Sequence, residues 1–293
     1  MRIEGRTAII TGASAGIGSE TAREFARRGA NVVLAARNKE GLDELAADLS
    51  PLPGRTLVVP TDVTDRLAVA ALVRRTVEEF GALDILVNNA GVGLFAPIVG
   101  GSLDNMHHLF NVNFWGAVHC VQNAVPYMKA QRRGHIVNVS SVAGRVAPPY
   151  MGIYSATKFA LAALSDALRV ELAGSGVSVS TVFPGLTETS FEDNMLHEMD
   201  VPEPPAILRH VAAAAVARRI AQAIRWRLRD AYVSPEDLAA VGLNTLAPQL
   251  VDWGFRLFWL GSWRLPTADL ALPSPEDRPE PSPADAEPPP ETV

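Results

Sequence analysis

Residues 7–18 read TAIITGASAGIG, a short apolar strand followed by a glycine-rich turn, and this stretch decides the fold. Gly12, Gly16 and Gly18 allow the backbone to turn sharply and to approach a diphosphate closely. The free amide groups at the start of the helix that follows favour negative charge. A turn of this composition can also be purely structural, but its position directly after an N-terminal strand favours a nucleotide site.

The rest of the chain continues this alternation of strand and helix. Strand-like apolar runs recur at residues 7–11, 31–36, 56–60, 83–88, 135–140, 177–183 and 231–234. Amphipathic helical patterns lie between them, at residues 17–28, 40–49, 65–80, 103–131, 153–174 and 206–228. Strict alternation predicts an α/β fold, in which a doubly wound, Rossmann-like parallel sheet of about seven strands carries helices on both faces.

Composition bounds the class of protein. The 293 residues are 48% hydrophobic and 20% charged, which is typical of a soluble globular protein, and the net charge of -6 argues against a nucleic-acid partner. The single cysteine, Cys120, excludes an internal disulfide and favours a reducing, cytoplasmic location. We expect no signal peptide, because the first residues pass directly into the strand and the glycine turn. The histidines lack ligand spacing, so we expect no metal site.

A second motif, YSATK at residues 154–158, contains one of only three lysines, which are Lys39, Lys129 and Lys158. Tyr154 and Lys158 are four residues apart, so on a helix both side chains emerge from one face. A phenol beside an ammonium group is a way to make a phenolate accessible. An isolated YxxxK motif is also compatible with an ordinary solvated helix face.

The GxxxGxG spacing of the turn and the YxxxK motif together resemble the short-chain dehydrogenase/reductase family, over about residues 5–235. The resemblance implies that a nicotinamide dinucleotide is bound by five motifs, namely the glycine turn, TDV, NNAG, YxxxK and PGxxxT. The residues implied are Gly12, Ser14, Ala15, Gly16, Ile17, Gly18, Asp62, Val63, Asn89, Ala90, Gly91, Tyr154, Lys158, Pro184, Gly185 and Thr189, with Thr187 as the alternative hydroxyl in the last motif.

The residue that selects the cofactor in this family lies at the end of the second strand. An acid at this position hydrogen-bonds the ribose hydroxyls of NAD, but here the position is Ala36 and the next residue is Arg37. A carboxylate would repel a 2'-phosphate, whereas a guanidinium forms charge-assisted hydrogen bonds with it. The resemblance therefore implies NADP as the cofactor, although Arg37 is also acceptable as a surface residue that starts a helix.

Four residues match the reactive centre of the family: Asn113, Ser141, Tyr154 and Lys158. Asn113 is preferred to Asn111 because the family pattern N-x-x-G continues to Gly116. Ser141 precedes Gly144 in the pattern S-x-x-G and lies thirteen residues before Tyr154, as the family expects. The family also implies that the asparagine opens its helix locally and holds a water.

The resemblance implies hydride exchange, in which NADPH reduces a carbonyl carbon while Tyr154 donates a proton to the oxygen. We expect Lys158 and the oxidised nicotinamide to lower the pKa of Tyr154, and Lys158 also to hold the nicotinamide ribose. Ser141 would orient the substrate oxygen. Asn113 would position a water that passes protons to Lys158.

The same reading divides the chain into three parts. Residues 1–234 are expected to form the catalytic domain, with an irregular candidate substrate loop at 186–205. Residues 235–270 are apolar and aromatic and are expected to form a helical extension, acting as a lid or subunit contact first and as a peripheral membrane contact through 235–265 second. Polar residues and Pro248 interrupt this run, which disfavours a spanning helix. Residues 271–293 contain eight prolines and many acids and should be disordered.

The favoured function is an NADP-dependent oxidoreductase that acts on CH–OH groups. Apolar residues after NNAG and between Ser141 and Tyr154 suggest a lipophilic alcohol or ketone as substrate. The alternative is a cofactor-binding sensor or scaffold without turnover, and an epimerase or dehydratase is a third class. Family members usually pair through the helices at 103–131 and 153–174, so a homodimer or homotetramer is expected. Substrate identity, direction and stereochemistry are left open.

Overall fold

The computed structural model describes residues 1–189, 191, 195–199 and 210–262. Within this part of the chain, seven parallel strands form the central sheet, in the order β11-β7-β6-β4-β1-β2-β3. These strands are β1 (Thr7–Thr11), β2 (Asn31–Ala35), β3 (Thr56–Val58), β4 (Ile85–Asn88), β6 (Gly134–Val139), β7 (Val177–Phe183) and β11 (Asp230–Tyr232). The prediction of a doubly wound, Rossmann-like sheet is confirmed. The strand order reverses between β1 and β4, which places a crevice at their carboxyl ends.

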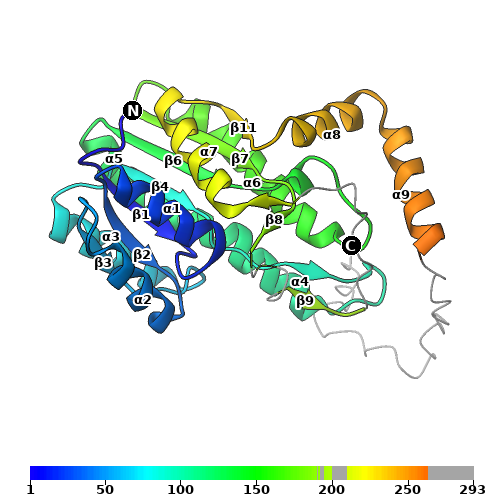
Figure 1. Ribbon diagram of the computed structural model, residues 1–293, viewed down its shortest axis with the longest axis horizontal. Helices are drawn as coiled ribbons and strands as arrows, with labels where there is room; N and C mark the ends of the chain where they lie inside the picture. The colour runs from blue at the N-terminus through cyan, green and yellow to red at the C-terminus, as the bar shows by residue number, and fades with distance from the viewer. Residues whose placement is uncertain (190, 192–194, 200–209, 263–293) are drawn as a thin grey trace, which may run out of the picture.

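Helices cover both faces of the sheet (Figure 1). One face packs against α1 (Gly16–Arg27), α2 (Lys39–Leu49) and α7 (Ala213–Trp226). The other packs against α3 (Arg66–Phe80), α5 (Gly116–Ala130) and α6 (Gly152–Glu171). Side chains alternate along a strand, so Ala8 and Ile10 of β1 enter the first core while Ile9 enters the second. This double burial explains why the strands read as continuous apolar runs.

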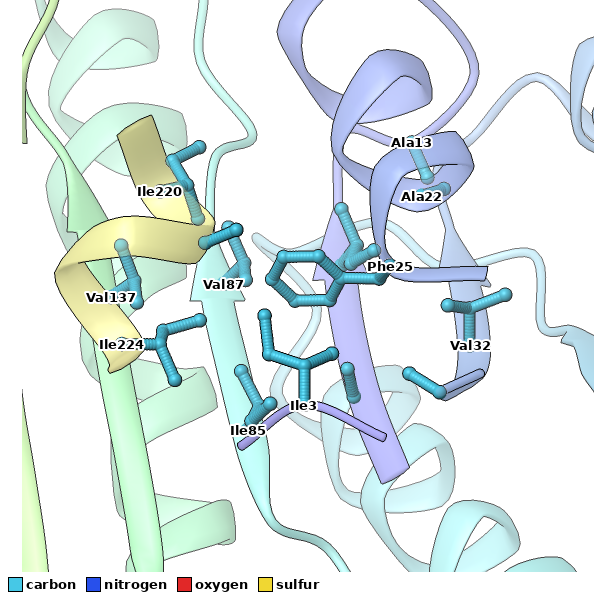
Figure 2. Packing of buried hydrophobic residues seen from close by; sticks show 14 of the residues in the cluster. Ile3, Ala13, Ala22, Phe25, Val32, Ile85, Val87, Val137, Ile220 and Ile224 are labelled. Atoms are coloured by element: carbon cyan, nitrogen blue, oxygen red, sulfur yellow. The ribbon is translucent and has the colours of Figure 1, made fainter. Parts of the chain in front are cut away.

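The core of the first face is centred on Phe25 of α1, which is fully buried. Figure 2 shows its ring above the sheet near Val87, with Ile3 beside it and with Ile220 and Ile224 of α7 on the same side. The two isoleucines are four residues apart and therefore lie on one face of α7. This packing fixes α1, and with it the glycine turn from which α1 begins.

The predicted helix at 103–131 is helical without a break over residues 103–130, and it opens locally around Asn113, as the family resemblance implied. The structure has α4 (Leu103–Phe110), a π-helical stretch at Asn111–Trp115, and then α5. The π-helical stretch carries the buried side chain of Asn113, which hydrogen-bonds to the backbone of Val92. Wider turns of this kind are rare and occur mostly at functional sites.

The candidate substrate loop contains short strands that its sequence did not predict. Two two-stranded parallel pairs accompany the main sheet. They are β5 (Leu94–Phe95) with β9 (Leu196–His197), and β8 (Thr187–Glu188) with β10 (Val211–Ala212). Residues 190, 192–194 and 200–205 of the predicted loop, and 206–209 of the predicted helix 206–228, lie outside the described residues.

Two further helices, α8 (Pro235–Leu246) and α9 (Pro248–Ser262), lie beyond the β11 edge of the sheet (Figure 1). Every residue of α8 is exposed or half-buried, and large apolar side chains such as Leu246 and Trp253 are exposed. Residues 263–270 of the predicted extension, and the predicted disordered tail 271–293, lie outside the described residues. Among the helices that the structure describes, each is too short or too polar to cross a membrane.

Candidate active site

Tyr154 and Lys158 lie one turn apart near the start of α6, and both side chains are buried, with 7% and 4% of their surface exposed. The Lys158 Nζ atom lies 5.7 Å from the centroid of the Tyr154 ring. It also donates a hydrogen bond of 3.1 Å to the carbonyl oxygen of Val139, the last residue of β6. The lysine is therefore held between its own helix and the end of a central strand.

Ser141 follows β6 and begins a short 3₁₀ helix (Val142–Gly144). Its Oγ atom accepts a 3.0 Å hydrogen bond from the Ala143 N–H and donates to the Pro184 carbonyl at 3.4 Å. Ser140 turns the other way, because its hydroxyl donates to the carbonyl oxygen of Lys158 at 2.9 Å. The two neighbouring serines thus point to different partners, and Ser141 is the one whose hydroxyl interacts with the hydroxyl of Tyr154.

Asn113 joins this group from the π-helical stretch. Its amide nitrogen donates to the Val92 carbonyl (2.9 Å) and to Thr157 Oγ1 (3.1 Å), while its oxygen accepts from the Val92 N–H at 2.8 Å. A methyl group placed on Gly91 would lie 3.2 Å from Asn113 Oδ1 and 3.4 Å from Lys158 Nζ, so these three residues are close neighbours. Asn111, in contrast, is exposed.

Burial dominates the ionisation of the pair on α6. It raises the pKa of Tyr154 to about 12, although a hydrogen bond with Ser141 acts in the opposite direction. It also lowers the pKa of Lys158 to about 8. In the protein alone, desolvation of the phenolate outweighs its favourable contacts, and the expected effect of Lys158 together with the oxidised nicotinamide on the pKa of Tyr154 stays a prediction. The buried tyrosine is a neutral phenol at neutral pH.

The glycine turn leads from β1 into α1. Gly12 and Gly16 have φ values of 65° and 55°, which L side chains rarely adopt. Gly18 is buried against the turn, and a methyl group there would overlap with the carbonyl oxygen of Gly12. Asn89 spans the turn from the NNAG segment, since its amide donates to the carbonyl oxygens of Thr11 (2.9 Å) and Gly12 (3.3 Å).

The start of α1 fits the diphosphate of a dinucleotide. Ala15 occupies the N-cap position, and among the described residues neither a side-chain cap nor an acid in the first turn occupies the amide groups of this helix start. The glycines leave the backbone open to close approach, and unoccupied amides at a helix start bind anions. Ser14 and Ile17 flank this turn and are half-buried.

The predicted adenosine end of the site lies beyond β2 and β3. Arg37 is exposed directly after the half-buried Ala36. Burial favours a raised pKa for Asp62, but hydrogen bonds from the backbone and hydroxyl of Thr64, together with the nearby charges of Arg37 and His108, hold that pKa below its ordinary value. Asp62 is therefore an ionised acceptor within the field of Arg37.

The other predicted cofactor residues lie close to these segments. Val63 is buried and packs against Gly116 at the start of α5. The Ala90 N–H donates to the hydroxyl of Thr11 at 3.0 Å. Thr189 lies beside Gly16, where a methyl group on the glycine would be 3.1 Å from the Thr189 Cβ atom.

Thr187 is placed differently from Thr189. It lies in β8, and its hydroxyl donates to the Gly185 carbonyl at 3.0 Å. Of the two candidate hydroxyls, Thr189 is thus the one that touches the glycine turn.

Sequence reasoning missed two positioning residues. The hydroxyl of Thr11 accepts hydrogen bonds from the N–H groups of Asn89 (2.9 Å) and Ala90, which pins the NNAG segment to β1. The hydroxyl oxygen of Thr157 accepts a hydrogen bond from the side-chain amide of Asn113, and Thr157 lies one helical turn from Tyr154. Its position three residues after Tyr154 is a usable signal, because i and i+3 share a helix face. In the part of the chain that the structure describes, no cluster of side chains could hold a metal ion.

An apolar cluster surrounds the Tyr154 ring. Its buried members come from β5 and the residue after it, from α4 and from the 3₁₀ helix, and they are Leu94, Ala96, Met106, Leu109 and Ala143. Phe191 packs on the same cluster, with its ring centroid 5.9 Å from that of Tyr154. The phenol hydroxyl is thus available in an environment that favours apolar groups over charged ones.

Comparison with known proteins gives one family. A family model described as short chain dehydrogenase matches residues 6–200. The 3-oxoacyl-[acyl-carrier-protein] reductase FabG of Thermotoga maritima is 38% identical over 195 residues, which cover 67% of this chain and 79% of that protein. The glycine betaine reductase ATRR of Emericella nidulans is 42% identical over 187 residues, which cover 64% of this chain but only 15% of the much longer relative.

Solved structures give the same likeness. A short-chain dehydrogenase/reductase from Burkholderia phymatum, in complex with NAD, superposes with a TM-score of 0.78 at 31% identity, covering 85% of this chain and 96% of the other. A short chain dehydrogenase from Burkholderia cenocepacia, in complex with NADP, superposes with a TM-score of 0.74 at 27% identity, covering 87% and 99%. Similar proteins thus bind either NAD or NADP.

Proposed function

This chain belongs to the short-chain dehydrogenase/reductase family of oxidoreductases, and from that membership we propose that it uses NADP(H) to interconvert a lipophilic carbonyl compound and its alcohol. The observation that carries the proposal is the group of buried Tyr154, Lys158 and Asn113 with half-buried Ser141, which the NNAG segment joins to the glycine turn at the open start of α1. When bound, the nicotinamide supplies hydride in reduction or accepts it in oxidation.

The residues of the chain then have separate tasks. Tyr154 gives its phenolic proton to the carbonyl oxygen in reduction and, as phenolate, removes a proton from the alcohol in oxidation. Ser141 donates a hydrogen bond that orients the substrate oxygen. Lys158 binds the ribose beside the nicotinamide and returns a proton to Tyr154, and Asn113 holds the backbone at Val92 and a water that serves Lys158. The pKa of about 12 for Tyr154 keeps the phenolic proton in place at neutral pH, as the reductive direction requires.

The preference for NADP rests on Arg37 and on the missing acid at Ala36. Arg37 is exposed two residues after the end of β2, and its charge acts on Asp62. A guanidinium matches the geometry of a phosphate, whereas an acid at position 36 would have matched the ribose hydroxyls of NAD. The other residues proposed to bind NADP(H) are those of the five family motifs, the glycine turn among them.

The apolar cluster around Tyr154 supports a lipophilic substrate. A ketone or alcohol with an alkyl, ring or acyl body would exchange water for contacts with Leu94, Met106 and Phe191 while its oxygen stays at Tyr154.

The test is the change in NADPH absorbance with a panel of apolar and polar ketones and aldehydes. We expect turnover to favour apolar members and to fall at least about a thousandfold in Tyr154→Phe, since a general acid and its orienting contacts are lost together. The control is NADPH affinity, which the substitution should lower far less than turnover, because the other residues of the family motifs still hold the nucleotide. Turnover that survives Tyr154→Phe would remove the tyrosine from the mechanism, and tight NADPH binding without turnover would favour the alternative of a sensor or scaffold.

We also propose that residues 1–234 act as the catalytic unit of a cytoplasmic homodimer or homotetramer. The large side chains of Trp115, Tyr127 and Phe159 on the surface of the α5 and α6 region are 40% or more exposed in the single chain, which supports a subunit contact there. Light scattering coupled to size exclusion should give a mass of two or four chains. A mass of one chain at micromolar concentration would overturn this part of the proposal.

A further inference from the structure

Helix α8 touches two segments of the active site, although it follows the last strand of the main sheet. The side-chain amide of Asn244 donates a 3.1 Å hydrogen bond to the carbonyl oxygen of Arg145, the residue after the 3₁₀ helix that begins at Ser141. Two helical turns towards its start, the carboxylate of Asp237 lies against the backbone of Gly185, and the Gly185 N–H acts to lower the pKa of that carboxyl. The two contacts link α8 to the loops after β6 and β7.

The two oxygens of Asp237 have different partners. Oδ2 accepts a 3.0 Å hydrogen bond from the Ser234 N–H, and Ser234 Oγ in turn accepts from the Asp237 N–H at 3.0 Å, so the pair closes the start of α8. Oδ1 lies against Gly185, where a methyl group on the glycine would overlap with it. The half-buried carboxylate therefore caps its own helix and holds a neighbouring turn at the same time.

The two loops that α8 holds meet at Ser141. The Val142 N–H donates to the Pro184 carbonyl at 2.8 Å, and the Ser141 hydroxyl points at the same oxygen from 3.4 Å. Gly185 follows Pro184 directly, so a displacement of the Gly185 N–H also displaces the oxygen that orients Ser141. Position errors of about 1 Å at a reacting group cost large factors in rate.

The base of α8 is itself fixed to this region. Tyr232 of β11 stacks on Phe183 of β7 with ring centroids 5.1 Å apart and an interplanar angle of 18°. The guanidinium of Arg145 lies 4.6 Å from the centroid of the Phe183 ring. The segment that leads into α8 and the loop that carries Ser141 therefore share a packed base, and α8 has a rigid support from which to hold them.

We propose that α8 completes the active site, with Asp237 as a positioning residue for the 184–185 turn and for Ser141, and with Asn244 as a second tie to the Ser141 loop. This inference rests on the proposed function, because it assigns Asp237 to the same hydride-transfer site. The simpler alternative is that Asp237 only caps α8, since a serine and an acid three residues apart commonly start a helix. The two alternatives differ in whether the position of the Gly185 backbone depends on the carboxylate of Asp237.

The experiment compares Asp237→Ala with Ser234→Ala and Asp237→Asn in the full chain. Ser234→Ala removes the cap but keeps the carboxylate at Gly185, while Asp237→Asn keeps an oxygen that can accept from Gly185. Each variant is measured for melting temperature, kcat, KM and hydrogen exchange of the Gly185 amide. Pro184 has no backbone N–H, so the preceding residue adds no amide signal of its own.

We expect Asp237→Ala and Ser234→Ala to lose similar stability. Only Asp237→Ala should lower kcat, about tenfold, with KM little changed, and only this variant should exchange its Gly185 amide faster. Asp237→Asn should retain most of the wild-type kcat and most of the protection at Gly185. Asn244→Ala should give a smaller fall in kcat, roughly threefold.

Equal kcat and equal Gly185 exchange in Asp237→Ala and Ser234→Ala would overturn the proposal and leave Asp237 as a cap alone. Hydrogen exchange separates this outcome from failure of the proposed function. If the wild-type protein reduces no carbonyl compound, the exchange at Gly185 in the three variants still decides whether Asp237 holds the turn.

Discussion

The helices α1 and α8 begin in opposite ways. The start of α1 at Ala15 is open, since among the described residues its amide groups have neither a side-chain cap nor a nearby acid. The start of α8 is closed by the reciprocal contacts of Ser234 and Asp237, with Glu236 adding a second negative charge. An open start can bind an anion from outside, whereas a closed start uses its own carboxylate to hold a neighbouring backbone. A helix start without a cap can therefore bind a ligand, whereas a capped start can hold a neighbouring part of the chain in place.

The largest break in this comparison should come from Gly18→Ala. The added methyl group would overlap with the carbonyl oxygen of Gly12, so the turn that presents the open start must move. We expect a loss of roughly a hundredfold in NADPH affinity, together with about 1–3 kcal/mol of stability. Fluorescence titration and thermal unfolding measure the two effects. The matched control is Gly254→Ala in α9, where the added group meets open space on a helical backbone and nucleotide affinity should hold.

Closing the open start should have the next largest effect. In Ala15→Asp, an aspartate would cap α1 and place a negative charge where the diphosphate is proposed to bind. We expect the nucleotide-free protein to gain about 0.5–1 kcal/mol of stability while NADPH affinity falls roughly tenfold. Ala15→Ser is the control, since it caps without charge and should lose less affinity. Equal affinity in all three proteins would show that α1 does not bind the phosphates.

A third helix start sharpens the comparison. In α2 the side chain of Asn38 accepts from the Gly41 N–H at 3.2 Å, so this start is capped and a 2'-phosphate there must depend on Arg37. We expect Arg37→Ala to lower the ratio of NADPH to NADH affinity about fivefold, because one exposed charge-assisted contact is lost. Lys39→Ala, one of the nearby exposed cations, should change the ratio less. A ratio unmoved by Arg37→Ala would contradict the proposed cofactor preference.

The smallest effect should come from opening the closed start. Ser234→Ala removes the hydroxyl that accepts from Asp237 and should cost about 1 kcal/mol, or about 2–4 °C in melting temperature. NADPH affinity should not change, because α8 does not carry the phosphate site. A loss of affinity equal to that of Ala15→Asp would erase the difference between the two helix starts.

The sheet and its turn were predictable from the sequence because they depend on local patterns. Strand and helix alternation predicted the seven parallel strands, and the motif spacings predicted that Ser141, Tyr154 and Lys158 would share a region. Strand ends were less accurate, since the run predicted at 56–60 forms β3 only at Thr56–Val58. The directions of the two adjacent serine side chains could not be read from their sequence, although the family motif selected Ser141. In the structure the Ser140 hydroxyl points to the carbonyl oxygen of Lys158.

Features that depend on distant contacts were not predictable. The family resemblance implied a local opening of the helix at Asn113, but not the contact that accompanies it, a hydrogen bond with Val92 twenty-one residues away. The raised pKa of Tyr154 depends on burial by β5, α4 and the Ser141 loop, which no motif reports. The contact of Asp237 with Gly185 joins residues that are far apart in the sequence, and the local pattern from Ser234 to Asp237 indicates only a helix start.

The burial of Lys158 makes the chain convenient for chemical tagging. Of the three lysines, Lys39 and Lys129 are exposed and Lys158 is 4% exposed. An amine-reactive dye applied to the intact protein should therefore acylate Lys39 and Lys129, in addition to the α-amino group, and leave Lys158 unmodified. Attachment to beads or fluorophores can proceed without harming the reactive centre, and a third acylated lysine in the mass spectrum would mark molecules whose interior had opened.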